Sequence, residues 1–441
     1  MDYLIINSPI YDKKVLTEES YLPPLGQGYI ATELKKNGFQ VSILDAVKKN
    51  LTIQEIIDEI IKLKPRYVGL NIFSINNLLV KEIVEKCPIQ TQFIIGGKSA
   101  KFLSNVILEY NTNNPIFVIV GEGEYITTAI IGQKLQEKPI KQHGNKCVYK
   151  VDKDSIYLPR DLSLLDLDRS LFKDYSIINK YGQLEDSIIT SRECIYNCAF
   201  CGGARSLNRD VPIRINPKEK IIEEISNIIN NNPAVQSIRV LDDLFLRDSQ
   251  SINNAIEIFG HFHLNWRAMA HVNSFEKCDA DIFTKLYKSG CKELEIGIET
   301  GSDEMRKIIN KVGTVNQVKS CVCKILDSGI NVKGYFIYGF PDETSKEMND
   351  TYNLVKFLRN YSSTSNGIFR ASAFQFRPYH GTKLYDKVVD RIQQYKHSDN
   401  LDILSGRSQF NFNAGNFSQC SQEFIDEKII LTNEVSKNHG L

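Results

Sequence analysis

The feature that most constrains the fold is a repeated alternation of short apolar runs with amphipathic stretches. In residues 1–140 we expect strands at 3–6, 40–44, 67–70, 92–95 and 117–120, separated by helical patterns at 28–37, 53–63, 77–86 and 99–109. Strands and helices that alternate in this way predict a parallel sheet covered on both faces. The first 140 residues are therefore expected to form a Rossmann-like, doubly wound α/β domain.

Small or turn-forming residues follow several of these predicted strands. The examples used below are Gly96-Gly97 and Gly121-Glu122. Ligands of open α/β sheets bind outside the carboxyl ends of the strands, so a binding crevice is expected there. A plainer interpretation is that each glycine only forms a tight turn.

A second alternation predicts another α/β domain. Its strands are expected at 187–190, 237–241, 266–270, 293–298, 333–338 and 370–376. Six βα units are too few for a complete eight-stranded barrel, so residues 185–390 predict a partial (βα)6 TIM-like barrel with its chemistry at the carboxyl ends of the strands. Residues 141–184 lack a clear period and are interpreted as a linker, and residues 391–441 as a short C-terminal extension.

Bulk composition excludes several classes of protein. The net charge of +1 indicates neither a nucleic-acid partner nor an anionic membrane. No apolar run approaches ~18 residues, so no membrane span is expected. An apolar run that starts at Tyr3, almost at Met1, is expected to leave no room for the basic and apolar regions of a signal peptide. Ten cysteines without an export signal predict reduced thiols and a cytoplasmic location.

Three closely spaced cysteines follow the first strand of the second alternation. Cys194, Cys198 and Cys201 lie at spacings of four and three, with Phe200 just before the last. Thiolates are the ligands of iron–sulfur clusters, and three of them leave one iron of a four-iron cluster open. The alternatives are a zinc site, which normally needs four ligands, or three unrelated buried thiols.

This CxxxCxxC motif, with its aromatic residue, resembles that of the radical S-adenosylmethionine superfamily. Further segments resemble the family's later strands, in the right order: 241–245, 290–302, 334–344 and 377–385. Residues 23–29, 38–45, 96–97 and 121–124 resemble the cobalamin-binding domain that precedes this barrel in one large subfamily. The domain order is similar to that of cobalamin-dependent radical methyltransferases.

The resemblance implies a 4Fe-4S cluster on Cys194, Cys198 and Cys201, whose open iron binds S-adenosylmethionine and yields a 5′-deoxyadenosyl radical. It also implies an external electron donor of the flavodoxin or ferredoxin type. The residues placed in contact with cofactors are Phe200, Asp242, Asp243, Arg267, Glu299 and Ile337 in the barrel, and Gly96, Gly97, Gly121 and Glu122 in the first domain.

Each of these barrel assignments has an alternative. The two aspartates, expected to face the cofactor ammonium, also suit a helix cap. Arg267 either touches the cofactor carboxylate or pairs with a barrel acid. Glu299 either binds the ribose diol or forms a salt bridge. Ile337 either packs on the adenine or is plain core.

The first domain departs from its family at the expected cobalt ligand. No His occurs before His143, so the DxHxxG motif is absent, and Lys98 stands where family members often have His. Either the corrin binds without a protein imidazole, or the domain has kept only its fold.

Two functions follow from these alternatives. The first is cobalamin-dependent methyl transfer to an unactivated carbon of a peptide or natural product. The second is a cobalamin-free radical reaction such as peptide epimerisation, with Cys420 as the hydrogen donor. In both cases the substrate is a small molecule or peptide. A simple iron–sulfur electron carrier would need a fourth cysteine ligand.

Overall fold

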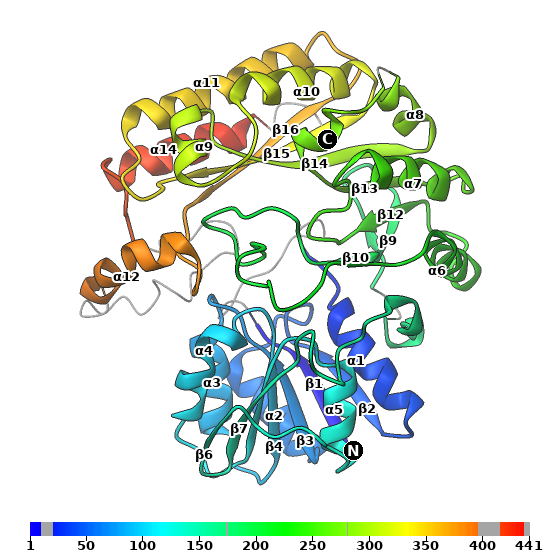
Figure 1. Cartoon of the computed structure of the whole chain (residues 1–441), viewed down its shortest axis with the longest axis vertical. Helices are drawn as coiled ribbons and strands as arrows, with labels where there is room; N and C mark the ends of the chain where they lie inside the picture. Colours follow the sequence, from blue (N-terminus) through cyan, green and yellow to red (C-terminus); the bar gives the residue numbers. More distant parts are fainter. Residues whose placement is uncertain (10–20, 173–174, 280, 396–414, 436–441) are drawn as a thin grey trace.

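The structure is a computed structural model, which describes residues 1–9, 21–172, 175–279, 281–395 and 415–435. Two α/β units lie one above the other, with the chain that follows β9 (Leu184–Ile188) passing between them (Figure 1). Within the described residues, no helix is both long enough and apolar enough to cross a membrane.

The first unit is a seven-stranded sheet with the strand order β2-β1-β3-β4-β5-β7-β6. Its first five strands are mutually parallel, which confirms the doubly wound prediction. Helices α1 and α5 pack on one face and α2, α3 and α4 on the other. The elements are β1 (Tyr3–Asn7), α1 (Leu25–Lys36), β2 (Val41–Asp45), α2 (Ile53–Leu63), β3 (Tyr67–Asn71), α3 (Asn77–Lys86), β4 (Gln92–Gly96), α4 (Ala100–Leu108), β5 (Ile116–Val120) and α5 (Glu124–Ile131).

The first sheet extends beyond its predicted boundary at residue 140. Strands β6 (Lys141–His143) and β7 (Lys146–Lys150) form an antiparallel hairpin, and β7 pairs with β5 in parallel. The predicted linker 141–184 therefore begins too early. The apolar pattern did not predict this hairpin, because β6 is polar and exposed and β7 buries only Val148 and Tyr149.

The second unit is also a seven-stranded sheet, in the order β16-β15-β14-β13-β12-β9-β8. Its six parallel strands curl into the predicted partial barrel (Figure 1). The strands are β8 (Ile177–Ile178), β9, β12 (Ser237–Val240), β13 (Asn265–Ala270), β14 (Cys291–Glu299), β15 (Asn331–Tyr338) and β16 (Phe369–Gln375). A short antiparallel pair, β10 (Ser191–Arg192) and β11 (Arg214–Ile215), lies apart from this sheet.

Helices cover the outside of the barrel. They are α6 (Lys218–Asn231), α7 (Ser249–Gly260), α8 (Ile282–Lys288), α10 (Val315–Asp327), α11 (Ser345–Ser362) and α14 (Gln422–Glu434). Helices α9 (Asp303–Ile308) and α12 (Lys383–Tyr395) instead pack in a separate apolar cluster with Ala199, Phe340 and Phe376. Helix α12 crosses the predicted barrel boundary at residue 390, because its helical pattern continues without a break. Helix α14 belongs to the predicted extension and packs against β16 and α11.

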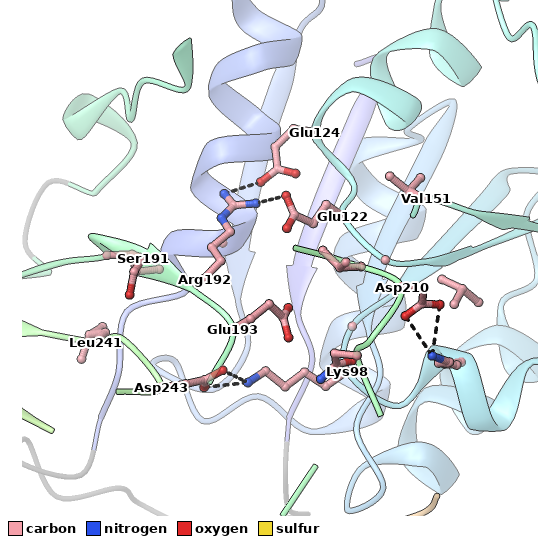
Figure 2. Close-up of a pocket in the computed structure, with 18 residues that line it drawn as sticks. Lys98, Glu122, Glu124, Val151, Ser191, Arg192, Glu193, Asp210, Leu241 and Asp243 are labelled. Atoms are coloured by element: carbon pink, nitrogen blue, oxygen red, sulfur yellow. Dashed lines mark hydrogen bonds and ion pairs between the residues drawn. The ribbon is translucent and has the colours of Figure 1, made fainter. Parts of the chain in front are cut away.

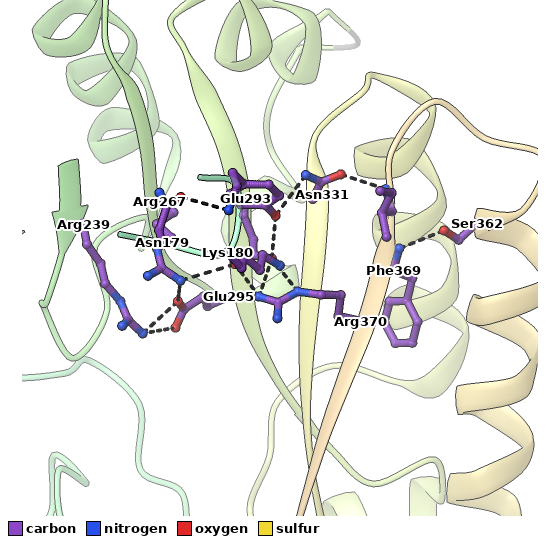
Figure 3. A network of polar contacts seen from close by, with 12 residues as sticks. Asn179, Lys180, Arg239, Arg267, Glu293, Glu295, Asn331, Ser362, Phe369 and Arg370 are labelled. Atoms are coloured by element: carbon purple, nitrogen blue, oxygen red, sulfur yellow. Dashed lines mark hydrogen bonds and ion pairs between the residues drawn. The ribbon is translucent and has the colours of Figure 1, made fainter. Parts of the chain in front are cut away.

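A buried layer of charges lies on the inner face of the barrel (Figure 3). Alternate residues of a strand face opposite sides, so Glu293 and Glu295 share the inner face of β14 while Leu294 packs in the core beneath the helices. Arg267 donates to Glu185 with distances of 2.6–3.1 Å. Lys180, from the predicted linker, pairs with Glu293 at 2.5 Å. The charged layer is therefore built from residues of both the predicted linker and the barrel strands.

Candidate functional site

The three predicted cluster ligands lie together in the loop after β10. The Cys194, Cys198 and Cys201 thiols are near enough to influence one another electrostatically. Backbone N–H groups donate to two of them, from Tyr196 to Cys194 Sγ at 3.4 Å and from Gly203 to Cys201 Sγ at 3.3 Å. Such donors stabilise thiolate sulfur and are among the groups that tune iron–sulfur clusters. The loop therefore offers three sulfur ligands of the kind that hold iron–sulfur clusters.

Two lysine–carboxylate pairs flank these thiols. Lys98 Nζ lies 2.7 Å from Asp243 Oδ1, and Lys311 Nζ lies 3.0 Å from Glu299 Oε1. Burial raises the pKa of all three thiols, that of Cys198 to about 11, and the two lysines oppose the rise. Iron binding would replace the thiol protons, since only the thiolate is a ligand.

The two adjacent aspartates have different surroundings. Asp242 is 3% exposed and accepts hydrogen bonds from Thr190 N at 2.7 Å, Thr190 Oγ1 at 2.6 Å and Ser191 Oγ at 2.5 Å. It thereby anchors the chain that leads into the cysteine loop. Asp243 instead lines a cavity and pairs with Lys98. Of the two, Asp243 is the one positioned to meet a ligand.

The remaining predicted cofactor contacts of the barrel lie either in an apolar cluster or in ion pairs. Phe200 packs edge-on against Phe340 with ring centroids 5.7 Å apart, and Ile337 joins the same small apolar cluster. Glu299 is salt-bridged, and its backbone has a φ of +67°. Arg267 is 1% exposed and pairs with barrel acids, which favours the second of its two interpretations.

Two cavities open between the first sheet and the barrel. The larger, of about 500 Å³, is lined by Gly96, Gly97, Gly121 and Glu122, which are the four residues predicted there, and extends to Leu241 of the barrel. The smaller, of about 350 Å³, adds Lys98, Glu193 and Asp243 (Figure 2). The crevice at the carboxyl ends of the first sheet thus continues to the cysteine loop.

Glycines shape the larger cavity. Gly26 lines it, and a Cβ atom at that position would meet nothing within 4 Å, so any side chain there would project into open space. At Gly69, deep in the same cavity, a Cβ would lie 2.1 Å from the Tyr3 hydroxyl. Gly26 therefore leaves its part of the cavity wall open, whereas Gly69 leaves room for the Tyr3 side chain.

Two arginines next to the cysteine loop form ion pairs with the first domain. The sequence did not predict these ion pairs. Arg192, two residues before Cys194, pairs with Glu122 at 2.5 Å and with Glu124 at 2.7 Å. Arg214 also binds Glu122. These contacts span 68 to 92 positions, and no local pattern signals them.

Cys420 lies just before α14. Its thiol packs against the core between the barrel strands and their helices, and burial with the nearby Glu343 and Glu347 raises its pKa. It is not among the described residues that line the two cavities. Its role as a hydrogen donor stays a prediction that these contacts do not favour.

Comparison with known proteins gives two family matches. Residues 188–355 match the radical SAM superfamily, where SAM is S-adenosylmethionine, and residues 14–131 match the B12 binding domain. The chain thus contains a radical SAM domain and a B12-binding domain. Its radical SAM domain implies a 4Fe-4S cluster and S-adenosylmethionine, and its B12-binding domain implies cobalamin. The chain is therefore a radical SAM enzyme.

Two similar proteins align with most of this chain. The uncharacterized methyltransferase PH0819 of Pyrococcus horikoshii is 26% identical over 83% of this chain and 78% of its own length. The anaerobic magnesium-protoporphyrin IX monomethyl ester cyclase of Rubrivivax gelatinosus is 22% identical over 85% of this chain and 67% of its own.

Solved structures show the same fold. The radical S-adenosylmethionine methyltransferase TsrM of Kitasatospora setae, with cobalamin and a [4Fe-4S] cluster bound, has a TM-score of 0.63 at 15% identity, covering 89% of this chain and 75% of its own. The cobalamin-dependent radical enzyme OxsB, with aqua-cobalamin and S-adenosylmethionine bound, has a TM-score of 0.65 at 15% identity, covering 93% and 64%.

Proposed function

We propose that this enzyme is a cobalamin-dependent methyltransferase that methylates an unactivated carbon of a peptide or natural product. The observation that carries the proposal is the pair of adjacent cavities, which share Gly97 and Glu122 in their walls and reach from Gly69 in the first sheet to Glu193 of the cysteine loop. The names of similar proteins support it, among them PH0819 and the cytidylyl-2-hydroxyethylphosphonate methyltransferase of Streptomyces wedmorensis, which is 20% identical over 83% of this chain and 78% of its own.

The cofactors would supply the reactive chemistry and the chain would position it. When bound, the cluster with S-adenosylmethionine supplies a 5′-deoxyadenosyl radical, and cobalamin carries the methyl group. Cys194, Cys198 and Cys201 would hold the cluster, with Asp243 beside it. The glycines of the larger cavity would admit the corrin, and Arg192 would fix the cysteine loop against the B12-binding domain.

The proposal includes the cellular setting. The partners are a small-molecule or peptide substrate and an external electron donor of the flavodoxin or ferredoxin type. The ten cysteines are all free of disulfides, which is consistent with a reducing cytoplasm.

Corrin retention tests the first step. The protein is incubated with hydroxocobalamin, passed through gel filtration and measured for corrin absorption. Wild-type protein is expected to retain the corrin, and Gly26→Trp to lose it, because its indole would fill the cavity. The matched control is Gly260→Trp, since a Cβ at Gly260 also meets nothing within 4 Å but lies at the end of α7, away from both cavities. A wild-type protein without corrin would contradict the proposal.

Isotope labelling tests the transfer. Reconstituted enzyme, reductant and S-adenosylmethionine with a deuterated methyl group are incubated with small-molecule and peptide fractions. The proposal expects a product heavier by one labelled methyl group. Incubation in deuterated water that instead places deuterium on a carbon of an otherwise unchanged peptide would favour epimerisation, and Cys420→Ala would then block turnover but not cleavage of S-adenosylmethionine.

A further inference from the structure

An ion pair separate from those of Arg192 connects the B12-binding domain to the surroundings of the cysteine loop. Lys98 follows the paired glycines at the end of β4, and Asp243 follows β12 of the barrel. Lys98 Nζ lies 2.7 and 2.8 Å from the two carboxylate oxygens of Asp243 (Figure 2). Both side chains line the smaller cavity and keep exposures of 55% and 38%. The pair is thus held between the domains rather than buried in either.

Asp243 lies close to a cluster ligand. The position that a Cβ would take at Gly203 is 3.6 Å from Asp243 Oδ2 and 3.7 Å from Cys201 Sγ. Gly203 also donates its backbone N–H to that sulfur at 3.3 Å. A residue without a side chain therefore separates the carboxylate from the thiol.

The two members of the pair act on the same thiols with opposite sign. Asp243 lies across Gly203 from the Cys201 sulfur, and the Lys98 ammonium is bonded to both carboxylate oxygens of Asp243. Cys198 has its own pair on the barrel side, Lys311 with Glu299.

We propose that Lys98 and Asp243 form a charge-balanced pair that sets the reduction potential of the cluster, so that docking of the B12-binding domain tunes the iron–sulfur site it faces. The proposal rests on the assignment of the cluster to Cys194, Cys198 and Cys201. Reduction adds one negative charge to a cluster, and nearby charge is one of the terms that sets its potential. A cation beside the sulfurs favours the reduced state, and an anion disfavours it.

Charge variants test this in the full-length protein with a reconstituted cluster. The measurement is a redox titration followed by electron paramagnetic resonance, without S-adenosylmethionine or substrate. Lys98→Met leaves Asp243 unbalanced and is expected to lower the reduced-to-oxidised ratio at fixed potential about tenfold, which equals about 59 mV for one electron. Asp243→Asn should raise the ratio. The double variant should lie near wild type, and Lys98→Arg should keep the wild-type value.

Lys101→Met is the matched control. Lys101 lines the same cavity but is held by Leu207 O at 2.7 Å and by Asp210 at 3.3 Å. Its loss should leave the potential unchanged. The inference is overturned when Lys98→Met and Asp243→Asn both leave the ratio within twofold, or both shift it in the same direction, since the latter indicates altered domain packing rather than charge. A wild-type protein that takes up no cluster contradicts the proposed function as well, whereas an unresponsive cluster contradicts only this inference.

Discussion

Buried charged side chains in the barrel are each paired with a specific side chain of opposite charge. Arg267 is 1% exposed and donates from two nitrogens to Glu185, which is itself 1% exposed. A buried charge that loses its partner keeps the cost of desolvation without the attraction that offset it. The consequence is that the inner layer of the barrel depends on each member of its network.

Replacing Arg267 by Met is expected to destabilise the protein by about 3–5 kcal/mol, because Glu185 would remain buried without its partner. The measurement is the free energy of unfolding from urea titration. Lys62→Met serves as the control, since Lys62 pairs with Glu59 while 68% exposed, and such surface pairs contribute only about 0–1 kcal/mol. Equal effects of the two substitutions would contradict the argument.

Glu343 predicts a pH dependence of stability. Its carboxylate accepts from Gly339 N at 2.7 Å and Phe340 N at 3.0 Å, but burial raises its pKa from 4.5 to about 8. The folded state therefore holds an extra proton between these two pH values, and this group makes stability fall as the pH rises from about 4.5 to 8. Glu343→Gln cannot ionise, so its urea midpoint should change less between pH 5 and pH 8 than that of wild type. A parallel pH profile would argue against a raised pKa.

At the residue scale, the sequence was informative where the chemistry is local. The cysteines could be predicted as a group because they lie within eight positions of one another. The difference between Asp242 and Asp243 could not, because it depends on which face of the chain each side chain occupies. The sequence likewise left open whether Glu299 binds a ribose or forms a salt bridge, because its partner Lys311 is 12 positions away.

Helix α14 has a structural task at the element scale. Strand β16 is the edge of the barrel sheet, and an open edge leaves backbone groups unpaired. The Asn433 side chain accepts from Ala373 N at 2.7 Å and donates to Ala373 O at 3.2 Å. Thr432 adds a hydroxyl contact with Tyr338 at 2.8 Å. The helix thereby covers the edge at which a complete barrel would continue.

Asn433→Ala should therefore destabilise the enzyme by about 1–3 kcal/mol, since two backbone groups of Ala373 lose their partner. Hydrogen exchange should also become faster at the Ala373 amide. The adjacent exposed residue supplies the control, Glu434→Ala, which should leave both quantities near wild type. Unchanged exchange at Ala373 would show that α14 does not protect the edge.

Element prediction succeeded where apolar periodicity was strong. All six barrel strands and the first five strands of the N-terminal sheet occur within a few residues of their predicted positions. It failed at β6 and β7, whose pairing depends on β5 rather than on their own polar sequence. The sequence of α14 did not predict its role, because that role depends on its contacts with β16 at the edge of the barrel sheet.

At the scale of the whole molecule, the enzyme is two domains that share one functional space. Arg192 links the two: it pairs with Glu122 and Glu124 (Figure 2). It also lies over the Tyr29 ring at 5.5 Å. Glu124 is 3% exposed; Arg192 binds its Oε1 atom, while its Oε2 atom has no hydrogen-bond partner among the described residues. The loop that carries the cysteines is thus anchored by a charge that the first domain supplies.

Arg192→Met should loosen this anchor, because the buried Glu124 carboxylate would lose its cation. We expect faster hydrogen exchange in residues 193–201 and 121–124, with little change in β14 and β15, whose pairing is internal to the barrel. Arg209→Met is the control, since Arg209 is an exposed cation of the same loop. Faster exchange throughout the barrel would indicate general destabilisation instead, and unchanged exchange in both segments would show that the domains are held together by other contacts.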